Sequence, residues 1–425
     1  MVRKNIFVLG LDAPNLDVLH ALPDAHRYRF HGLSNTEQLL ASEKIDLPRL
    51  LEECESTLEN FNGSIDAIVG YWDFPVSTMV PILCQRFGLP GAPLRAVLTC
   101  EHKYWSRLEQ QRVIEEYPHF GVIELDGPDR LPPGVSFPAW VKPIKSAASV
   151  LAFYVEDDAQ LARALREIRG GIALMGDPFE LALTRVDLPP EVAQVGAKAC
   201  LAEDAVGGRQ VTLEGFSFAG RVHVYGIIDS ITYPNSSSFL RYQHPADLPE
   251  DTSRQLARCA ERVIGQIGLD NSTFNIEFFC DLERDSINLL EVNPRHSQSH
   301  ARLFEYVDGM ANHAFMVRLG LGQPPPRLTG GAGKYRVAAR WFLRRFTDGK
   351  VCRGPTPKEI QALERKVGGT TVHVVAHTGR RLSDLPQQDS YSYELARIDM
   401  GGRSEADLIE KYERCVESLP FEFDE

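Results

Sequence analysis

The chain has 425 residues, of which 43% are hydrophobic and 24% charged, and it carries a formal net charge of −12. A chain of this length folds as more than one domain, and its near-average composition excludes a disordered or fibrous protein. The acidic balance excludes the basic footprint that binding to nucleic acid or to an anionic membrane requires. We therefore expect a globular protein whose anionic ligands are met by local cations.

Neither the first residues nor any later segment has the pattern of a targeting or membrane-spanning sequence. Asp12 interrupts the short apolar run near the start, which predicts a buried strand rather than a signal peptide. No stretch reaches the ~20 apolar residues that span a bilayer. The eight cysteines are scattered without a C-x-x-C pair, which argues against a zinc site and a disulfide framework. We expect a cytoplasmic protein without a membrane partner.

Residues 1–110 have the pattern of an open α/β domain. Short apolar runs such as NIFVLG and DAIVG alternate with helical stretches such as VSTMVPILCQRFG. This alternation is typical of parallel strands in a layered α/β fold. Gly10 follows the first strand, but LGLD lacks the G-x-G-x-x-G spacing, so we expect a plain turn rather than a dinucleotide site.

Residues 111–325 are expected to form a second domain with a small α/β lid at about 130–215. The Pro/Gly-rich segment DGPDRLPPGVSFP precedes the strand AWVKPI, and Asp157 or Asp158 can cap the helix that follows. Two β-rich runs, KACLAED and QVTLEGFSFAGRVHVYGIID, come next, with Ala-Gly as a hairpin turn. This order predicts a helix packed beside a small sheet.

The remaining chain predicts a long helix, a strand hairpin and a third domain. An amphipathic helix lies around Thr252 to Ile267 and precedes the hairpin TFNIEFFCDLERDSINLLEVN. Residues 326–425 turn to short strands and turns, and they close with a helix that Ser404 and Asp407 begin at capping-box spacing. We therefore expect a mixed α/β domain at the carboxyl terminus.

Two glutamates of that hairpin predict a metal site. With Arg284 at the centre of the polar loop, Glu277 and Glu291 fall directly opposite each other. Two facing carboxylates repel unless a cation lies between them, and Asn293 shares the face of Glu291 and offers a third oxygen ligand of the kind Mg²⁺ accepts. The alternative is a pair of solvated strand residues, but the apolar neighbours of both glutamates favour buried strands. We predict a Mg²⁺ or Mn²⁺ site with Arg295 beside it to neutralise developing charge.

The run EVNPR after a hydrophobic strand, preceded by NIEFF, resembles the metal-binding segment of the ATP-grasp superfamily. A lysine before the lid, a lysine on its first strand and a glutamate at its end extend the resemblance over nearly the whole chain. The chain is most similar to the carboxylate-amine ligases, including bacterial L-amino-acid ligases, with a preATP-grasp domain, a grasp core with a mobile lid, and a carboxyl-terminal domain. The resemblance implies an enzyme that spends ATP to activate a carboxylate as an acyl phosphate and joins it to an amine, releasing ADP and phosphate.

The resemblance also implies roles for single residues. Lys103 reaches the α-phosphate, Lys142 lies under the triphosphate, and Arg295 acts on the reacting groups. The small-residue loop PIKSAASV closes over the phosphates through Lys145, Ser146 and Ser149. Because exposed lysines are common and each lysine by itself is a weak signal, the order of the motifs carries these assignments.

The adenosine part of the nucleotide is assigned in the same way. Glu203 stands where family members accept the adenine amino group, and either Gln210 or Glu214 holds the ribose. Backbone groups of three following residues continue the hinge: Asp204, Ala205 and Val206. The alternative for Glu203 is a solvated loop acid.

The acid, the amine and the neighbouring reactions stay open. Biotin carboxylases read E-M-N-T-R-L-Q-V-E-H in the matching segment, whereas Ser299 stands here at the position of their bicarbonate-binding glutamate, so we rank bicarbonate activation below ligation. A thiol acceptor, a non-catalytic nucleotide-binding protein and a homodimer remain alternatives. Four residues are candidates for substrate contact or for shaping the rim: Arg241, His296, His300 and Arg302.

Overall fold

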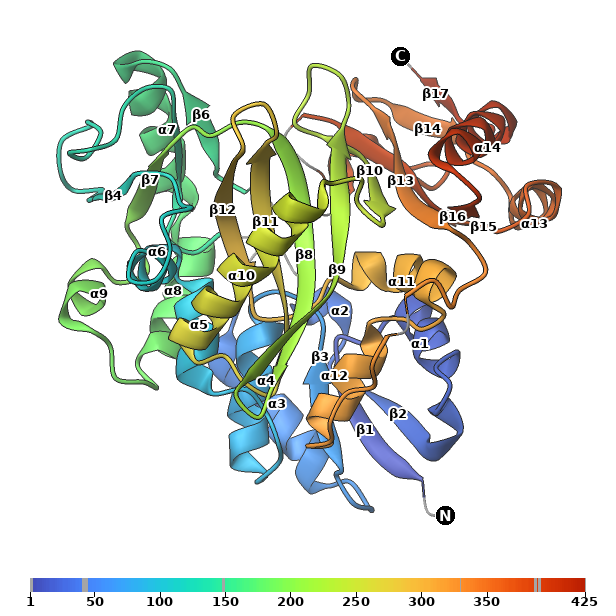
Figure 1. Cartoon of the computed structure of the whole chain (residues 1–425), viewed down its shortest axis with the longest axis horizontal. Coiled ribbons are helices and arrows are strands. Elements are labelled where there is room, and N and C mark those ends of the chain that lie inside the picture. The colour runs from blue at the N-terminus through green and yellow to red at the C-terminus, as the bar shows by residue number, and fades with distance from the viewer. Residues whose placement is uncertain are drawn as a thin grey trace.

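The computed structural model describes residues 3–39, 45–146, 150–328, 330–385, 388 and 391–424. In that part of the chain, the strands form sheets of three, four, eight and two strands. Figure 1 shows the eight-stranded sheet at the centre, the four-stranded sheet to its left and the three-stranded sheet below it. Every helix in the described ranges is too short or too polar to cross a bilayer.

The three-stranded sheet belongs to the amino-terminal domain, and its parallel pairing confirms the expected α/β layer. Its strand order is β2-β1-β3, formed by β1 (Lys4–Leu9), β2 (Tyr28–Leu33) and β3 (Ala67–Gly70). Strands buried on both faces are apolar throughout, which explains the run NIFVLG. The neighbouring helices are α1 (Ala13–His20), α2 (Thr36–Leu39), α3 (Leu47–Glu59), α4 (Val76–Arg86), α5 (Leu94–Glu101) and α6 (Lys103–Gln110).

The four-stranded sheet is the lid, and it spans residues 120–204. Its order is β4-β7-β5-β6, formed by β4 (Phe120–Ile123), β5 (Ala139–Pro143), β6 (Phe153–Val155) and β7 (Cys200–Asp204). One face packs against α7 (Asp158–Gly171), which begins after the cap Asp157 as expected. The chain continues through α8 (Ala173–Leu183) and α9 (Pro190–Val195).

The predicted lid boundaries, about 130–215, are therefore wrong at both ends. Phe120–Ile123 already pairs with β7 as an edge strand of the lid. At the other end β8 (Arg209–Phe218) pairs with β9 (Arg221–Thr232) and β11 (Ser272–Asp281) and so belongs to the large sheet. Hydrogen bonding between strands that are distant in sequence, rather than local composition, decides which sheet a strand joins.

The eight-stranded sheet joins the second and third expected domains. Its order is β12-β11-β8-β9-β10-β13-β16-β15, with β10 (Phe239–His244), β12 (Ser286–Asn293), β13 (Val337–Arg345), β15 (Thr370–Val374) and β16 (Tyr393–Gly402). Because β10 pairs with β13, the sheet runs across the boundary predicted at residues 325 and 326. The carboxyl-terminal strands extend the large sheet, and they carry the short pair β14 (Lys350–Arg353) and β17 (Glu422–Asp424) beside it.

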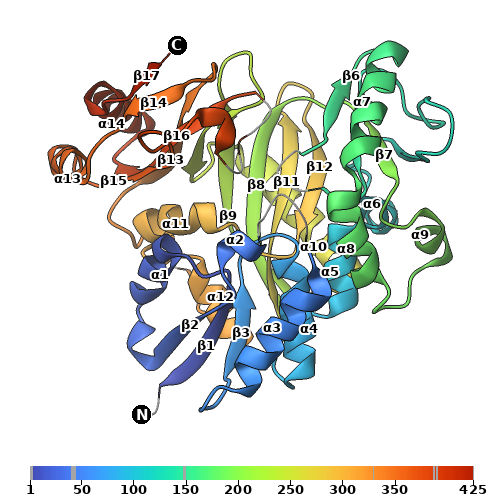
Figure 2. The same cartoon turned by 180° about the vertical axis from the view of Figure 1, so that it is seen from behind.

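One face of the large sheet is covered by an apolar core, and the opposite face is only partly apolar. α10 (Glu250–Ile267) lies across the front of the sheet in Figure 1, where its Leu256 and Val263 join Ile276 and Phe278 in one core. Side chains of neighbouring strand residues point to opposite faces, so Glu277 lies on the face opposite α10. That face of the sheet is turned to the viewer in Figure 2. We call this second face the cleft face.

The remaining helices connect and cover these layers. They are α11 (Ala301–Asp308), α12 (His313–Gly320), α13 (Pro357–Lys366), α14 (Glu405–Ser418) and the short 3₁₀ turns η1 (Ala25–Arg27), η2 (Gln298–His300) and η3 (Leu382–Asp384). Met316 and Val317 of α12 pack into the core that contains Ile6 and Val8. This packing holds the amino-terminal sheet against the segment that follows β12.

Candidate active site

The paired glutamates lie where the sequence predicts them, but a bulge produces the pairing. Glu277 is the direct cross-strand partner of Glu291, which confirms the expected pairing of these two residues. Nearer the loop, Phe278 pairs with Leu289, so the register shifts by one residue and Leu290 is the extra residue. The assumed symmetric hairpin around Arg284 is thus wrong. The bulge at Leu290 brings the two carboxylates opposite each other, in keeping with the frequent use of bulges to aim side chains at functional sites.

Arg107 supports this bulge from the neighbouring helix α6. Its guanidinium donates to the backbone oxygens of Leu289 and Leu290 at 2.9 and 2.8 Å and to Glu203 at 2.5 Å. The side chain is 2% exposed. A planar guanidinium with several fixed donors suits such simultaneous contacts. Arg107 therefore ties the lid to the strand that presents Glu291.

The two carboxylates have different electrostatic surroundings. Burial, followed by the charge of Glu291, raises the pKa of Glu277 to about 7. Burial also acts to raise the pKa of Glu291, but Lys103 and then Lys142 outweigh it and hold that pKa below its ordinary value. A cation between the two carboxylates would stabilise their ionised forms, because it neutralises both charges. The pair is suited to a divalent metal.

The third predicted ligand lies beside the pair. Asn293 is opposite Asn275 on the cleft face, and its Nδ2 donates to Oδ1 of Asn275 at 2.9 Å. This hydrogen bond leaves the Asn293 amide oxygen as the acceptor for a cation. The described residues contain no cluster of three His, Cys, Asp or Glu side chains suited to a metal. Two carboxylates and one amide nevertheless fit Mg²⁺, which usually keeps several waters and binds nucleotide phosphates as well.

The cations expected to hold phosphates are both near this pair. The Lys103 ammonium makes an ion pair with Glu291 and donates to the backbone oxygen of Ser146 at 3.2 Å. Lys142 pairs with Glu203 at 2.6 Å. Both lysines are buried among acids, which excludes ordinary surface positions for them. Their roles toward phosphate stay predictions.

The predicted role of the Glu203 side chain needs correction. Its carboxylate is 2% exposed and accepts from both Arg107 and Lys142, so it is not open to an adenine amino group. In the hinge, the amides of Asp204 and Ala205 already donate to the carbonyls of His119 and Pro138 at 2.9 and 3.0 Å. These two amides are therefore not available either, and Val206 begins the loop that leads to β8.

The two candidates for the ribose are separated by the structure. Gln210 lies on the cleft face and donates from Nε2 to Glu277 at 3.0 Å. Glu214 is fully buried and accepts from Tyr225 Oη at 2.7 Å, from His300 Nδ1 at 2.8 Å and from the amide of Ser297 at 2.9 Å. Because those donors satisfy Glu214, the prediction that it holds a ribose is wrong. Gln210 keeps that role as a prediction.

The phosphate-loop candidates are only partly described. Lys145 makes an ion pair with Glu101, lies 5.4 Å from the centroid of the Phe74 ring and 5.5 Å from that of Phe179, and is close enough to Glu291 to act on its ionisation, so its role toward phosphate stays a prediction. Ser146 is buried, and its backbone oxygen accepts from Lys103. Ser149 lies outside the described residues.

Arg295 is held by a residue that the sequence did not single out. Its Nε donates to Oδ1 of Asp73 at 2.7 Å, and a second guanidinium nitrogen contacts the same oxygen. Asp73 follows β3, in the loop at the carboxyl end of a parallel strand. Ligands bind beside such strand ends in open α/β sheets, and this rule was the signal that could have found Asp73. Arg107 could have been found as the residue one helical turn after Lys103.

The two histidines proposed to touch substrate are instead buried structural residues. His296 bonds to Thr273 at 3.1 Å and to His313 at 2.8 Å, and burial followed by His313 lowers its pKa. His300 bonds to the buried Glu214, and burial lowers its pKa as well. Desolvation favours the neutral imidazole, which can donate and accept within such a network. These contacts overturn the expected substrate role of both.

The two arginines with the same expectation differ from each other. Arg241 makes an ion pair with Glu405 and lies over the Trp341 ring at 4.6 Å. Its neighbour Tyr242 contacts the ring of His300, so Arg241 points to the opposite face, away from the cleft face, and the prediction is wrong. Arg302 is half-buried on α11 and lies 3.4 Å from Glu305, and its role stays a prediction.

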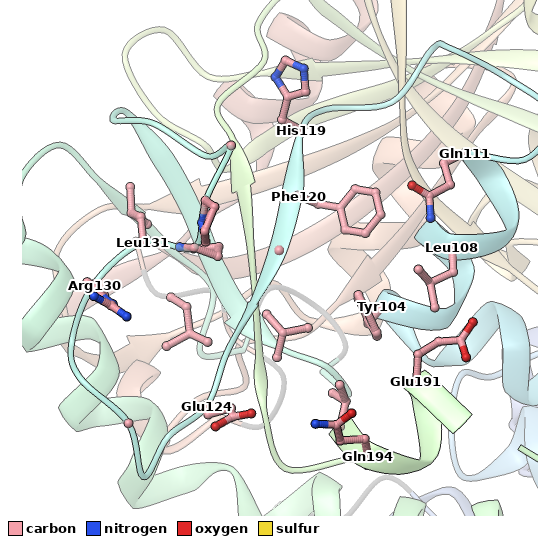
Figure 3. A pocket seen from close by; sticks show the side chains of 18 of the residues that line it. Tyr104, Leu108, Gln111, His119, Phe120, Glu124, Arg130, Leu131, Glu191 and Gln194 are labelled. Atoms are coloured by element: carbon pink, nitrogen blue, oxygen red, sulfur yellow. The ribbon is translucent and has the colours of Figure 1, made fainter. Parts of the chain in front are cut away.

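A large cavity lies away from these groups. It has a volume of about 690 Å³ and is bounded by α6, β4, α9 and the loop around Arg130. Figure 3 shows Tyr104, Leu108 and Phe120 close together along it, with Glu191 and Gln194 below. The metal and phosphate candidates do not line it, whereas a much smaller space touches Lys103, Lys142 and Glu291.

Comparison with known proteins identifies the domain. Residues 135–301 match the family model of the ATP-grasp domain. The chain is 26% identical over 315 residues to carnosine synthase 1 of Gallus gallus. The aligned region covers 71% of this chain and 32% of that protein. This chain thus spans about a third of that relative.

Two solved structures have the same fold over the whole chain. The L-amino acid ligase from Bacillus licheniformis has a TM-score of 0.74 at 15% identity and covers 100% of both chains. The biotin carboxylase domain of the Hydrogenobacter thermophilus 2-oxoglutarate carboxylase, in complex with MgADP, ADP and bicarbonate, has a TM-score of 0.67 at 13% identity and covers 100% of this chain and 91% of that one. The chain therefore has the ATP-grasp fold, and its residues 135–301 match the ATP-grasp domain, in keeping with the expected resemblance.

Proposed function

We propose that this protein is an ATP-dependent ligase that activates a carboxylate, an amino acid or small organic acid, as an acyl phosphate and joins it to an amine with release of ADP and phosphate. The observation that carries the proposal is the facing pair Glu277 and Glu291, with Asn293 beside it and Lys103, Lys142 and Arg295 around it. A Mg²⁺ ion bound there would neutralise and orient the nucleotide phosphates. The proposed location is the cytoplasm, in keeping with eight free cysteines.

The protein's own residues have separate tasks in this proposal. Glu277, Glu291 and Asn293 hold the ion, and Lys103 and Lys142 bind phosphate oxygens. Arg295 lies after Asn293 and neutralises the charge that develops as the carboxylate attacks the terminal phosphate and, later, as the amine attacks the acyl phosphate. Because the acyl group is carried by phosphate, the reaction needs no nucleophile from the protein.

The direct test is ADP release screened over amino acids and small organic acids, each with and without an added amine. A ligase releases ADP and phosphate only with a suitable acid, and faster when the amine is present. Nucleotide binding without any acid-dependent hydrolysis would refute the proposal in favour of a non-catalytic nucleotide-binding protein. A thiol added in place of the amine separates a thioester-forming enzyme from an amide-forming one.

The ion pair between Lys103 and Glu291 leads to an expectation about metal and nucleotide. The lysine neutralises a proposed metal ligand, so a cation competes with it for Glu291. We expect Lys103→Met to bind Mn²⁺ about 3- to 10-fold more tightly without nucleotide, because a competing charge is removed. The same variant should bind ATP with Mg²⁺ about 10-fold more weakly, because a phosphate contact is lost.

Electron paramagnetic resonance of free Mn²⁺ and calorimetry with a non-hydrolysable ATP analogue measure these two affinities. Lys198→Met is the matched control, because Lys198 pairs with Asp177 on the surface at 2.9 Å and should change neither value. If both affinities changed in the same direction, the proposal that Lys103 pairs with Glu291 without nucleotide and with phosphate when ATP is bound would be contradicted.

A further inference from the structure

Asp73 and Arg295 form an ion pair between two parts of the fold. Asp73 is in the loop after β3, and Arg295 follows β12, more than 200 positions later in the chain. The backbone oxygen of Asp73 accepts from the amide of Val76 at 2.9 Å, and neighbouring Trp72 donates from its indole to Gly10 at 2.8 Å. These bonds fix the loop and hold the Asp73 carboxylate at the edge of the candidate site.

The pair is asymmetric in a way that leaves room for a second partner. Both contacting guanidinium nitrogens use Oδ1 of Asp73, and among the described residues Oδ2 accepts no hydrogen bond. The Asp73 side chain is 37% exposed, against 14% for Arg295. A carboxylate can accept at both oxygens, so the partly exposed Asp73 keeps one oxygen for a second donor.

Catalysis as proposed above would take the arginine away from this partner. When Arg295 contacts the substrate carboxylate or the acyl phosphate, Asp73 loses its counter-ion in a place already rich in negative charge. Asp73 is close enough to Glu277 to act against the ionisation of that residue. An uncompensated, partly buried carboxylate is costly, so a substrate that brings its own cation is favoured over one that does not.

We propose that Asp73 binds the ammonium group of the acid substrate, so that the enzyme selects amino-bearing carboxylic acids over plain carboxylic acids. A zwitterion replaces the single Asp73–Arg295 pair with two pairs, its carboxylate with Arg295 and its ammonium with Asp73. Asp73 is thus a specificity residue supplied by the amino-terminal domain. This inference rests on the proposed function, which names the reaction but leaves the acid open.

The test compares Asp73→Asn and the unaltered protein on matched acids with and without the amino group. Suitable pairs are alanine with propionate and phenylalanine with 3-phenylpropionate. Hydroxylamine serves as the acceptor, and hydroxamate formation is measured, because this acceptor is largely neutral and needs no residue to deprotonate it. We expect the variant to raise KM about 10- to 100-fold for the amino acid and to change KM for the plain acid less than about threefold.

The contrary result is equally specific. If Asp73 only orients Arg295, both acids lose kcat to the same extent, and the proposal is overturned. It is also overturned if the unaltered protein uses the plain acid as well as the amino acid. Asp66→Asn is the control for damage to the amino-terminal domain, since Asp66 lies before β3, at the end opposite Asp73, and pairs with Lys4 at 2.6 Å.

A binding measurement separates this inference from the proposed function. Calorimetry with Mg²⁺, a non-hydrolysable ATP analogue and either acid reports selectivity without turnover. Absence of acid-dependent ADP formation by the unaltered protein refutes the ligase, whereas equal binding of the two acids refutes the role of Asp73. Preferential binding of the amino acid that Asp73→Asn abolishes supports it.

Discussion

Glu291→Gln is expected to leave a folded protein whose acid-dependent ADP release is at least about 10³-fold slower than that of the unaltered protein. The substitution keeps the shape of the side chain but removes one of two facing charges, so a divalent cation loses a carboxylate ligand and several kcal/mol of charge stabilisation. The fold should survive, because Glu291 is partly exposed and its removal relieves the repulsion that helps to raise the pKa of Glu277.

Steady-state ADP release at increasing Mg²⁺ measures this effect, and circular dichroism checks the fold. Glu283→Gln is the matched control, because Glu283 lies exposed in the loop of the same hairpin and should be neutral. Activity equal to that of the unaltered protein at saturating Mg²⁺ would remove Glu291 from the metal site and with it the main support for the proposed function.

The second large effect is expected on stability, from Glu203→Gln. The Glu203 carboxylate is buried between Arg107 and Lys142, and a glutamine leaves both cations without a full counter-charge. Breaking a buried pair by removing one partner typically costs about 3–5 kcal/mol. Since Arg107 also supports the Leu290 bulge, we expect the loss of stability to extend from the lid to β12. Faster amide hydrogen exchange in β5, β7 and β12 measures it.

The same cluster gives a pH dependence with a definite sign. Burial acts to raise the pKa of Glu203, but Arg107 and then Lys142 outweigh it and lower that pKa to about 2. A lowered pKa contributes stability above the ordinary value of the unfolded chain, about 4.3, and this contribution is lost as the pH falls toward 2. Hydrogen exchange in the lid should therefore accelerate between about pH 4.5 and pH 2 in the unaltered protein and less in Glu203→Gln. Glu191→Gln, on the exposed face of α9, is the control, and an equal response in both variants would contradict the assignment.

Much of the fold followed from local sequence patterns. The buried first strand, the helix capped by Asp157, the Ala219–Gly220 hairpin turn and the long helix α10 each lie close to their predicted places. Hydrophobic periodicity and capping residues act within a few positions, so they can be identified without knowing the rest of the fold. The lid boundaries and the third domain were less predictable, because strand pairing between distant segments decides both.

The residues of the candidate site also fall into those that the sequence could predict and those that only the structure revealed. The sequence indicated the facing glutamates with their asparagine and arginine, because an antiparallel hairpin is a local structure, but only the structure showed the bulge at Leu290 that produces their pairing. Only the tertiary structure decided which side chains are already occupied: Glu214 and His300 bond to each other in the core, Glu203 binds Arg107, and Asp73 reaches Arg295 from another domain. Burial and pairing between distant segments depend on how the layers pack, and that packing is not encoded in the spacing of any single motif.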